Sequence, residues 1–130
     1  MADLTVAIVT PEREVYSGPA SDVRAPGWDG EFDVLPSHDM FLALLRGGIV
    51  SLVTPQGPKR WVVGRGFAEV GNDRVVILTD RCEPVEQIDK TTIQSELETA
   101  EKALTETSEG SPAWEASAEK REIALGRLFA

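Results

Sequence analysis

Hydrophobic and polar positions alternate along most of the first 85 residues of the chain. Leu4, Val6 and Ile8 share one face of a six-residue run, which is the period-two pattern of a half-buried strand. Pro11 should end this strand, because proline cannot donate to a β-ladder. Further β-like runs are residues 15–16, 22–25, 31–35, 49–54, 60–63, 67–70 and 74–78.

Turn-forming clusters separate these runs. They are Ser17-Gly18-Pro19, Pro26-Gly27, Gly47-Gly48, Pro55-Gln56-Gly57 and Gly71-Asn72-Asp73. The last cluster predicts a tight hairpin between residues 67–70 and 74–78. Many short strands with frequent turns predict a β-sandwich or a barrel.

The hydrophobic period changes after Pro84 and predicts two helices. Ile93, Leu97, Ala100 and Leu104 are spaced as on one face of a helix, for which Asp89 is the expected N-cap, with Ile88 and Ile93 forming a hydrophobic staple. Gly110 should close this helix, and Ser111-Pro112 should begin the second. The stripe of the second helix is Trp114, Ala118, Leu125 and Leu128, with the stem of Arg121 between them. Because the loop is short, the two helices should form an antiparallel hairpin that buries both stripes.

Composition restricts the class of protein. The chain has 130 residues, one cysteine and a formal net charge of −9, so one compact domain with a short appendage is expected, and nucleic acid and anionic lipid are poor partners. Cys82 cannot form an intramolecular disulfide, which favours a reducing compartment, and we interpret it as a small hydrophobe. The longest apolar run, residues 40–45, is far shorter than the about twenty residues that span a bilayer. The first residues carry no signal-peptide pattern, so we expect a chain that begins as written and does not insert into the membrane.

Candidate catalytic chemistry is scarce. His38-Asp39 is the only histidine beside an acid, and neighbouring residues on a strand face opposite ways, so they would not form a dyad there. A transition-metal site would have to depend on one histidine and one cysteine, so we expect no metal and no cofactor. Gly64-Arg65-Gly66 lacks the rest of a dinucleotide fingerprint. These observations argue against an enzyme acting alone.

Three segments together resemble the epsilon subunit of F-type ATP synthases. They are residues 9–18 (VTPEREVYSG); residues 25–27 (APG) with 30–38 (GEFDVLPSH); and residues 66–70 (GFAEV) with 75–80 (VVILTD). The likeness covers about the first 85 residues in content, order and spacing. The departures are local: the family usually has glycine at the positions of Asp33 and Ser37, often proline at that of Met40, and often Ser-Gly at those of Gly64-Arg65. The lost glycines make the loop near His38 less predictable.

The resemblance implies a fold and a role. The fold would be a flattened ten-strand β-sandwich, residues 1–86, followed by an antiparallel α-helical hairpin, residues 87–130. The role would be that of a non-catalytic central-stalk subunit, which couples the gamma subunit to the membrane c-subunit ring so that proton flow drives ATP synthesis. The protein would then be peripheral, on the cytoplasmic face of a bacterial inner membrane. The alpha and beta subunits would be partners only if the hairpin extends.

The resemblance also assigns site residues. Gly30, Glu31 and Phe32 match the family position that contacts the ring, and His38 matches a position that faces gamma. Both have local alternatives, an ordinary turn carboxylate for Glu31 and a hydrogen bond within the loop for His38. Some members bind ATP on the hairpin through a motif that ends in arginine. At Ile88 and Asp89 this motif is degenerate and the arginine is missing, so no nucleotide binding is expected.

Two other interpretations remain open from the residues alone. A free-standing β-sandwich could bind a small molecule or glycan, with Trp28 and Trp61 as stacking surfaces, although each is better explained as core or interface. A small enzyme is disfavoured by the scarcity of catalytic groups. Within the family, the short and acidic second helix predicts a weak or absent inhibitor of ATP hydrolysis.

Overall fold

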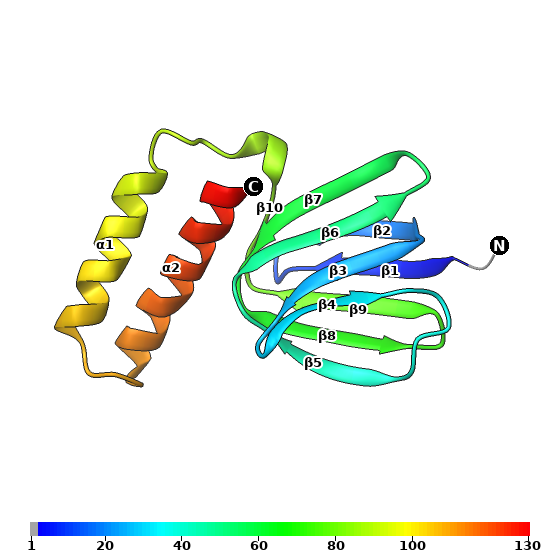
Figure 1. Cartoon of the computed structure of the whole chain (residues 1–130), viewed down its shortest axis with the longest axis horizontal. Helices are drawn as coiled ribbons and strands as arrows, with labels where there is room; N and C mark the ends of the chain where they lie inside the picture. Colours follow the sequence, from blue (N-terminus) through cyan, green and yellow to red (C-terminus); the bar gives the residue numbers. More distant parts are fainter. Residues whose placement is uncertain (1–2) are drawn as a thin grey trace.

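A computed structural model describes residues 3–130 as ten strands, one short 3₁₀ helix and two α-helices (Figure 1). The strands are β1 (Leu4–Val9), β2 (Glu14–Ala20), β3 (Asp22–Gly27), β4 (Gly30–Val34), β5 (Phe41–Leu45), β6 (Gly48–Thr54), β7 (Gly57–Val63), β8 (Gly66–Gly71), β9 (Arg74–Thr79) and β10 (Cys82–Pro84). The helical elements are η1 (Val85–Gln87), α1 (Ile93–Glu106) and α2 (Pro112–Phe129). The predicted fold, a β-sandwich followed by a helical hairpin, is confirmed.

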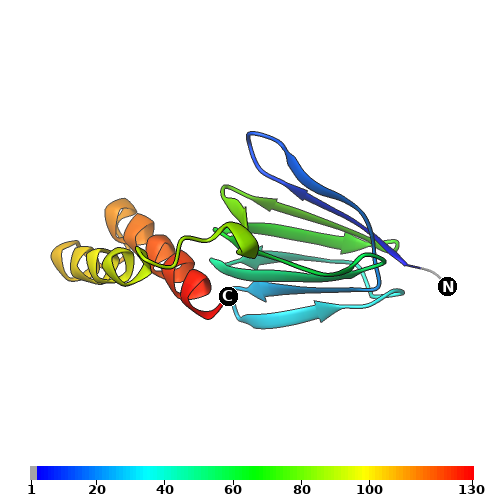
Figure 2. The same ribbon diagram turned by 90° about the horizontal axis from the view of Figure 1, so that it is seen from above.

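One hydrogen-bonded path joins the strands in the order β10-β7-β6-β3-β5-β8-β9-β1-β2, and β4 pairs with β3. The link between β3 and β5 is a single residue pair, Gly27 with Leu45. The sheet bends at this weak link, so that one half covers the other. Tyr16 of β2 and Trp61 of β7 meet across the two halves, with ring centroids 5.6 Å apart. Figure 2 shows the strands on one side of the molecule and the two helices on the other.

The alternation in the first strand is confirmed, because Leu4, Val6 and Ile8 are all 1% exposed or less. The tight hairpin between β8 and β9 is also confirmed. Asn72 and Asp73 have φ of 53° and 55°, the positive values that a two-residue type I′ turn requires.

Two predicted turns are wrong, and two strands escaped prediction. Ser17-Gly18-Pro19 lies within β2, at the end of the strand order, where proline is tolerated because one edge of the strand is unpaired. Pro26-Gly27 ends β3, and the turn follows at Trp28 and Asp29. A Cβ at residue 27 would lie 2.5 Å from the Gly30 carbonyl oxygen, so this glycine serves close packing rather than turning. The strands without a predicted counterpart are β5 and β10.

The helical hairpin is correct in kind, with α2 lying between α1 and the sandwich in Figure 1. Ser111 caps α2 as predicted, since its hydroxyl accepts a hydrogen bond from the Trp114 N–H. Asp89 is not the cap of α1: the helix begins after Thr92, and Asp89 instead accepts hydrogen bonds from the backbone and hydroxyl of Thr91. The predicted Ile88–Ile93 staple is therefore wrong as well. α1 ends at Glu106, so Gly110, with φ of 82°, lies in the following loop.

The stripe predicted for α2 is incomplete. Leu128 is 43% exposed, whereas the buried residues of α2 are Glu122, Ala124 and Gly126. The reason is that α2 has two packed sides, one against α1 and one against β6 and β7. A single apolar stripe accounts only for the first.

Candidate docking surfaces and hairpin interface

The three residues predicted to contact the ring lie at the turn end of the β3–β4 hairpin. Gly30 has φ of 139°, which favours glycine. The Glu31 side chain is 61% exposed and forms an ion pair of 3.7 Å with Arg24. The Phe32 ring turns inward and meets Phe41 edge-on, with centroids 5.4 Å apart. Only the Glu31 carboxylate of this group therefore presents charge to solvent at the turn.

An acidic pair lies at the other end of the same hairpin. Burial, followed by a hydrogen bond with Asp33 and the charge of Asp33, raises the pKa of Asp22 to about 6. Asp33 is in turn 3.7 Å from Arg24. A carboxyl with a raised folded-state pKa stabilises the fold below its ordinary pKa, and that contribution is lost as the pH rises through about 6.

His38 is exposed and lies on Phe41, with ring centroids 5.0 Å apart. Its Nδ1 is 3.0 Å from the carbonyl oxygen of Asp39. The preceding Ser37 has φ of 68°, and its N–H donates to the Asp73 carboxylate at 2.5 Å. This hydrogen bond explains how serine holds a conformation that glycine adopts more easily. Phe41 thus connects the two predicted contact regions, since Phe32 and His38 both pack on it.

The sequence did not reveal an exposed apolar surface on β5, β8 and β9. Leu42 and Leu44 of β5 are 69% and 57% exposed, and Phe67 of β8 and Leu78 of β9 are 46% and 44% exposed. Leu44 pairs with Phe67, and Phe67 pairs with Leu78, so these three side chains form a row across three strands, and Leu42 lies two residues before Leu44 on the same face of β5. We call these four residues the apolar face. The signal was present in the apolar run 40–45, where a strand would have hydrophobic residues on both faces.

A groove of about 370 Å³ adjoins the apolar face. It is lined by Leu44 and Phe67 of that face, together with Trp28, Arg65 and Asp80. The indole ring of Trp28 is 47% exposed and lies 4.8 Å from the Arg65 guanidinium carbon. Of the two predicted stacking surfaces, only Trp28 is accessible, since Trp61 is 6% exposed and belongs to the core.

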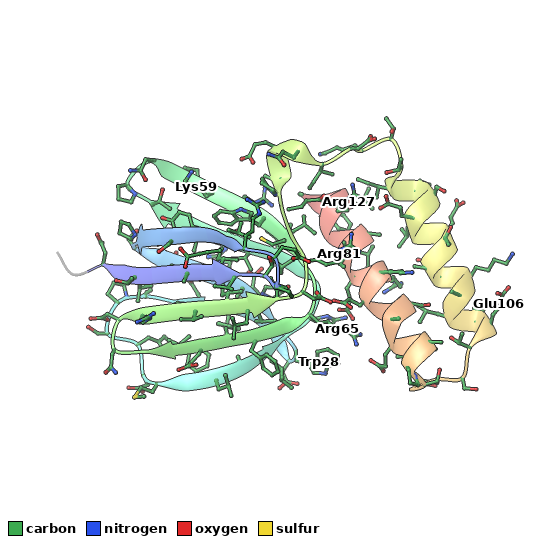
Figure 3. All side chains as sticks on the ribbon, turned by 180° about the vertical axis from the view of Figure 1, so that it is seen from behind. Trp28, Lys59, Arg65, Arg81, Glu106 and Arg127 are labelled. Carbon is green, nitrogen blue, oxygen red and sulfur yellow. The ribbon has the colours of Figure 1, made fainter. Side chains whose placement is uncertain are left out.

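A charge cluster holds α2 on the sandwich. Arg65, between β7 and β8, donates from Nη2 to Glu122 Oε2 at 2.8 Å and from Nη1 to Glu115 Oε2 at 2.6 Å. Its backbone N–H donates to Glu119 Oε2 at 2.8 Å. Figure 3 shows Arg65 at the end of the sandwich that faces α2, with Trp28 beside it. We call Arg65, Glu115, Glu119 and Glu122 the Arg65 cluster.

Glu122 is the most buried member of this cluster, at 8% exposure. Besides Arg65, it accepts a hydrogen bond of 2.7 Å from the backbone N–H of Gly47. Glycine is needed at this position, because a Cβ on residue 47 would lie 2.8 Å from the Glu122 Cβ. At Gly64, a Cβ would collide with the carboxylates of Asp80 and Glu119. The corner residues of the sandwich are therefore small where the helix approaches.

The pKa values of Arg65 and Glu119 are both raised, but for different reasons. The hydrogen bonds that Arg65 donates to Glu122 raise the pKa of Arg65, which keeps its charge. Burial has the largest effect on Glu119 and raises its pKa. The neighbouring Asp80 raises this pKa further, while the hydrogen bond from the Arg65 N–H lowers it. The Glu119 contribution to folding is therefore present below the ordinary pKa of glutamate and is lost as the pH rises through the raised value.

The sequence contained a signal for this interface that we interpreted differently. Glu115, Glu119 and Glu122 are spaced four and three apart, so they share one face of α2. From the sequence alone, the acidity of this helix indicated only a weak or absent inhibition of ATP hydrolysis. The structure gives them a partner in Arg65, which stands where the resembled family often has the glycine of Ser-Gly.

The degenerate nucleotide motif lies in the connection from η1 to α1. Asp89 is engaged by Thr91, whose side-chain hydrogen bond holds the pKa of Asp89 below its usual value. Lys90 Nζ donates to the carbonyl oxygen of Ala130 at 3.3 Å. Within residues 3–130, no group of three or more His, Cys, Asp or Glu side chains is arranged to hold a metal ion. Neither helix in this range is both long and apolar enough to cross a bilayer.

Comparison with known proteins identifies the family. The family model described as the β-sandwich domain of the ATP synthase delta/epsilon chain matches residues 3–85. The ATP synthase epsilon chain of Moorella thermoacetica is 38% identical over 131 residues, which cover 100% of this chain and 97% of that protein. The epsilon chain of Myxococcus xanthus is 45% identical over 89 residues, 68% of this chain. This second match spans 65% of the relative's own length.

Solved structures agree with this fold. A chain in the mitochondrial ATP synthase of Euglena gracilis, solved as OSCP/F1/c-ring, superposes with a TM-score of 0.82 at 22% identity, covering 97% of this chain and 79% of that one. A chain in the central stalk/c-ring structure of Tetrahymena thermophila gives a TM-score of 0.60 at 16% identity, with 98% and 94% covered. At these identities the likeness shows the fold. The family-model match and the full-length relative go further, and the chain belongs to the family of ATP synthase epsilon chains.

Proposed function

We propose that this chain is a non-catalytic rotor subunit of a proton-translocating ATP synthase. In this role it joins the gamma subunit to the c-subunit ring, so that the two turn as one body. The observation that carries the proposal is the apolar face, which neither α1 nor α2 covers. A row of exposed leucine and phenylalanine side chains on a sheet is typical of a permanent interface. The central-stalk and c-ring descriptions of the two structural neighbours support this assignment.

Gamma is the proposed occupant of the apolar face, and His38 is a proposed part of the same contact. Phe41 connects them, because it carries the His38 ring and precedes Leu42 on β5. The alternative, a free-standing ligand-binding β-sandwich, has less support. The exposed apolar row is continuous and open, whereas small-molecule sites are concave and bury most of the ligand surface.

The ring contact is proposed at Gly30, Glu31 and Phe32, with the Glu31 carboxylate facing basic groups of the ring. To test the proposed function, the chain is captured from an assembled rotor and the retained gamma and ring are measured. Glu31→Lys should retain gamma and weaken attachment to the ring about fivefold, because an exposed ion pair contributes about 1 kcal/mol. The matched change Glu12→Lys, at an exposed turn carboxylate, should retain both partners. Equal ring attachment in the two variants would remove Glu31 from the contact, and a wild-type chain that captures neither partner would contradict the proposed function.

The location follows from this assembly. The protein would be peripheral, on the cytoplasmic face of a bacterial inner membrane, and would meet the alpha and beta subunits only through an extended hairpin. Nucleotide binding to the isolated chain is not proposed, since Asp89 is engaged with Thr91 and the family arginine is missing.

We also propose that the hairpin is a weak or absent inhibitor of ATP hydrolysis. In the folded-down state the three glutamates of α2 are held by Arg65, and release would expose an acidic helix. Deleting residues 89–130 in the assembled enzyme should therefore raise ATP hydrolysis by less than about threefold, a barrier change below 1 kcal/mol. An increase of tenfold or more would show that the hairpin inhibits.

A further inference from the structure

We infer that Arg65 is a latch that determines whether the helical hairpin stays on the sandwich. The inference concerns the chain by itself and goes beyond the proposed function, which does not assign a role to this residue. It rests on how α2 meets β6 and β7, on the burial of the Arg65 cluster, and on where the other tie of α2 is located.

The buried residues of α2 are Glu122, Ala124 and Gly126, none of which has a large apolar side chain. Where the two approach most closely, backbone meets backbone: a Cβ on Gly126 would lie 3.3 Å from Val62 and 3.4 Å from the Gly48 Cα. On either side of this approach the surface is hollow. An open cavity of about 390 Å³ lies between Ile123 and strands β7 and β10, and a second of about 300 Å³ lies around Trp28 and Trp114. Apolar burial between α2 and the sandwich is therefore limited.

Arg65 compensates for this limited apolar burial with contacts to three glutamates on three successive turns of α2. The guanidinium contacts Glu122 through two nitrogens, at 2.8 and 3.2 Å, and reaches Glu115 through the third. Its backbone N–H holds Glu119 between them. The Arg65 side chain is 22% exposed and that of Glu122 is 8% exposed, so solvent screens this pair less than a surface ion pair.

A second set of ion pairs holds α2 near its C-terminal end, away from the Arg65 cluster. Arg127 forms ion pairs with Glu83 of β10 and Glu96 of α1. Glu83 immediately precedes the segment that joins the sandwich to α1, so this tie lies at the covalent connection. Arg121 pairs with Glu101 of α1 and does not reach the sandwich. Arg46, which lies between β5 and β6, also reaches Glu122, but at 3.9 Å and from a side chain that is 51% exposed, so it is a weaker partner of this carboxylate than Arg65. Losing the Arg65 side chain would therefore weaken the attachment of the part of α2 that lies farthest from the connection, while both helices remain paired.

Hydrogen exchange of single backbone amides in the full-length chain tests the latch. The Gly47 N–H donates to Glu122 of α2, so its exchange reports the departure of the helix. The Ile77 amide lies in β9, between β8 and β1, and reports the sandwich alone. In Arg65→Gln, exchange at Gly47 should accelerate tenfold or more, with Ile77 changed by less than twofold. Arg121→Gln also removes one positive charge, but from a residue of α2 whose ion pair is with Glu101 of α1. It should change the exchange rate of neither amide by more than twofold.

An acceleration below tenfold at Gly47 in Arg65→Gln, or an equal acceleration at Ile77, overturns the inference. The second result would make Arg65 a determinant of the whole fold. Because Arg65→Gln could prevent folding, Glu115→Gln provides an independent measurement. It removes only the charge of the outermost contact, at a partly exposed helix position, and leaves the sandwich core unaltered. Exchange at Gly47 should then accelerate about threefold; an unchanged rate contradicts the latch.

Discussion

The double substitution Leu44→Gln/Phe67→Gln should weaken binding of the chain to the gamma subunit about 10- to 100-fold. The two side chains are neighbours in the apolar row, paired across β5 and β8. They are 57% and 46% exposed in the free chain, so roughly half of each remains to be buried by a partner. Burying a whole leucine or phenylalanine contributes about 1.5–3 kcal/mol. Two half-burials therefore give about 1.5–3 kcal/mol, which corresponds to a factor of about 10 to 100 in affinity.

The same substitutions should leave the isolated chain folded, because both side chains point away from the core. Thermal unfolding of the variant should remain within about 3 °C of the wild type, as for most surface substitutions. Val53→Gln is a matched control, since Val53 is an outward strand residue that is 47% exposed on β6, in the other half of the sheet. If the double variant and the control bind gamma with the same affinity, the apolar face is not the gamma interface.

The elements that could be predicted from sequence are those whose pattern is local. The alternation of residues 4–9 gives one buried face, and the Asn72-Asp73 turn needs only two positive φ values. Ser111-Pro112 was sufficient to place the start of α2, because a capping hydroxyl and a proline act within one helical turn. Cys82 also agrees with its interpretation as a small hydrophobe, since burial raises the pKa of its thiol to about 11.

What escaped prediction depends on distant partners. β5 has apolar residues on both faces, and only the bend of the sheet at Gly27 and Leu45 leaves one of those faces exposed. Pro26 and Gly27 look like a turn in isolation, yet the close approach of Gly30 makes them the end of a strand. The role of Arg65 cannot be read locally either, because its three glutamate partners follow it by at least fifty residues.

The site residues divide in the same way. Glu31 and His38 came from the family resemblance, and the structure leaves both exposed, where a partner could reach them. It adds that each has a local contact, Arg24 for Glu31 and Phe41 for His38. Their contribution to assembly remains a prediction that the charge-reversal experiment measures.

Gly66→Ala should destabilise the sandwich more than any other glycine substitution among the described residues. Gly66 begins β8 and pairs with Thr79 of β9. A Cβ at this position would lie 1.8 Å from the Leu78 carbonyl oxygen and 2.9 Å from both the Leu78 carbonyl carbon and the Thr79 Cα. All three atoms are backbone, so the clash cannot be relieved by a side-chain rotation. β8 and β9 would have to separate where Leu78 joins the apolar face.

Overpacking of this kind costs about 3 kcal/mol, which corresponds to a fall in Tm of about 10 °C for a chain of this length. Gly71→Ala provides the comparison at the opposite end of the same strand. There the added Cβ would meet only the side chain of Met40, which is 73% exposed and free to move. Because glycine restricts the unfolded chain least, alanine at residue 71 should cost less than about 1 kcal/mol. Chemical unfolding of the two variants measures the difference directly, and equal midpoints would show that the β8–β9 backbone approach does not limit the fold.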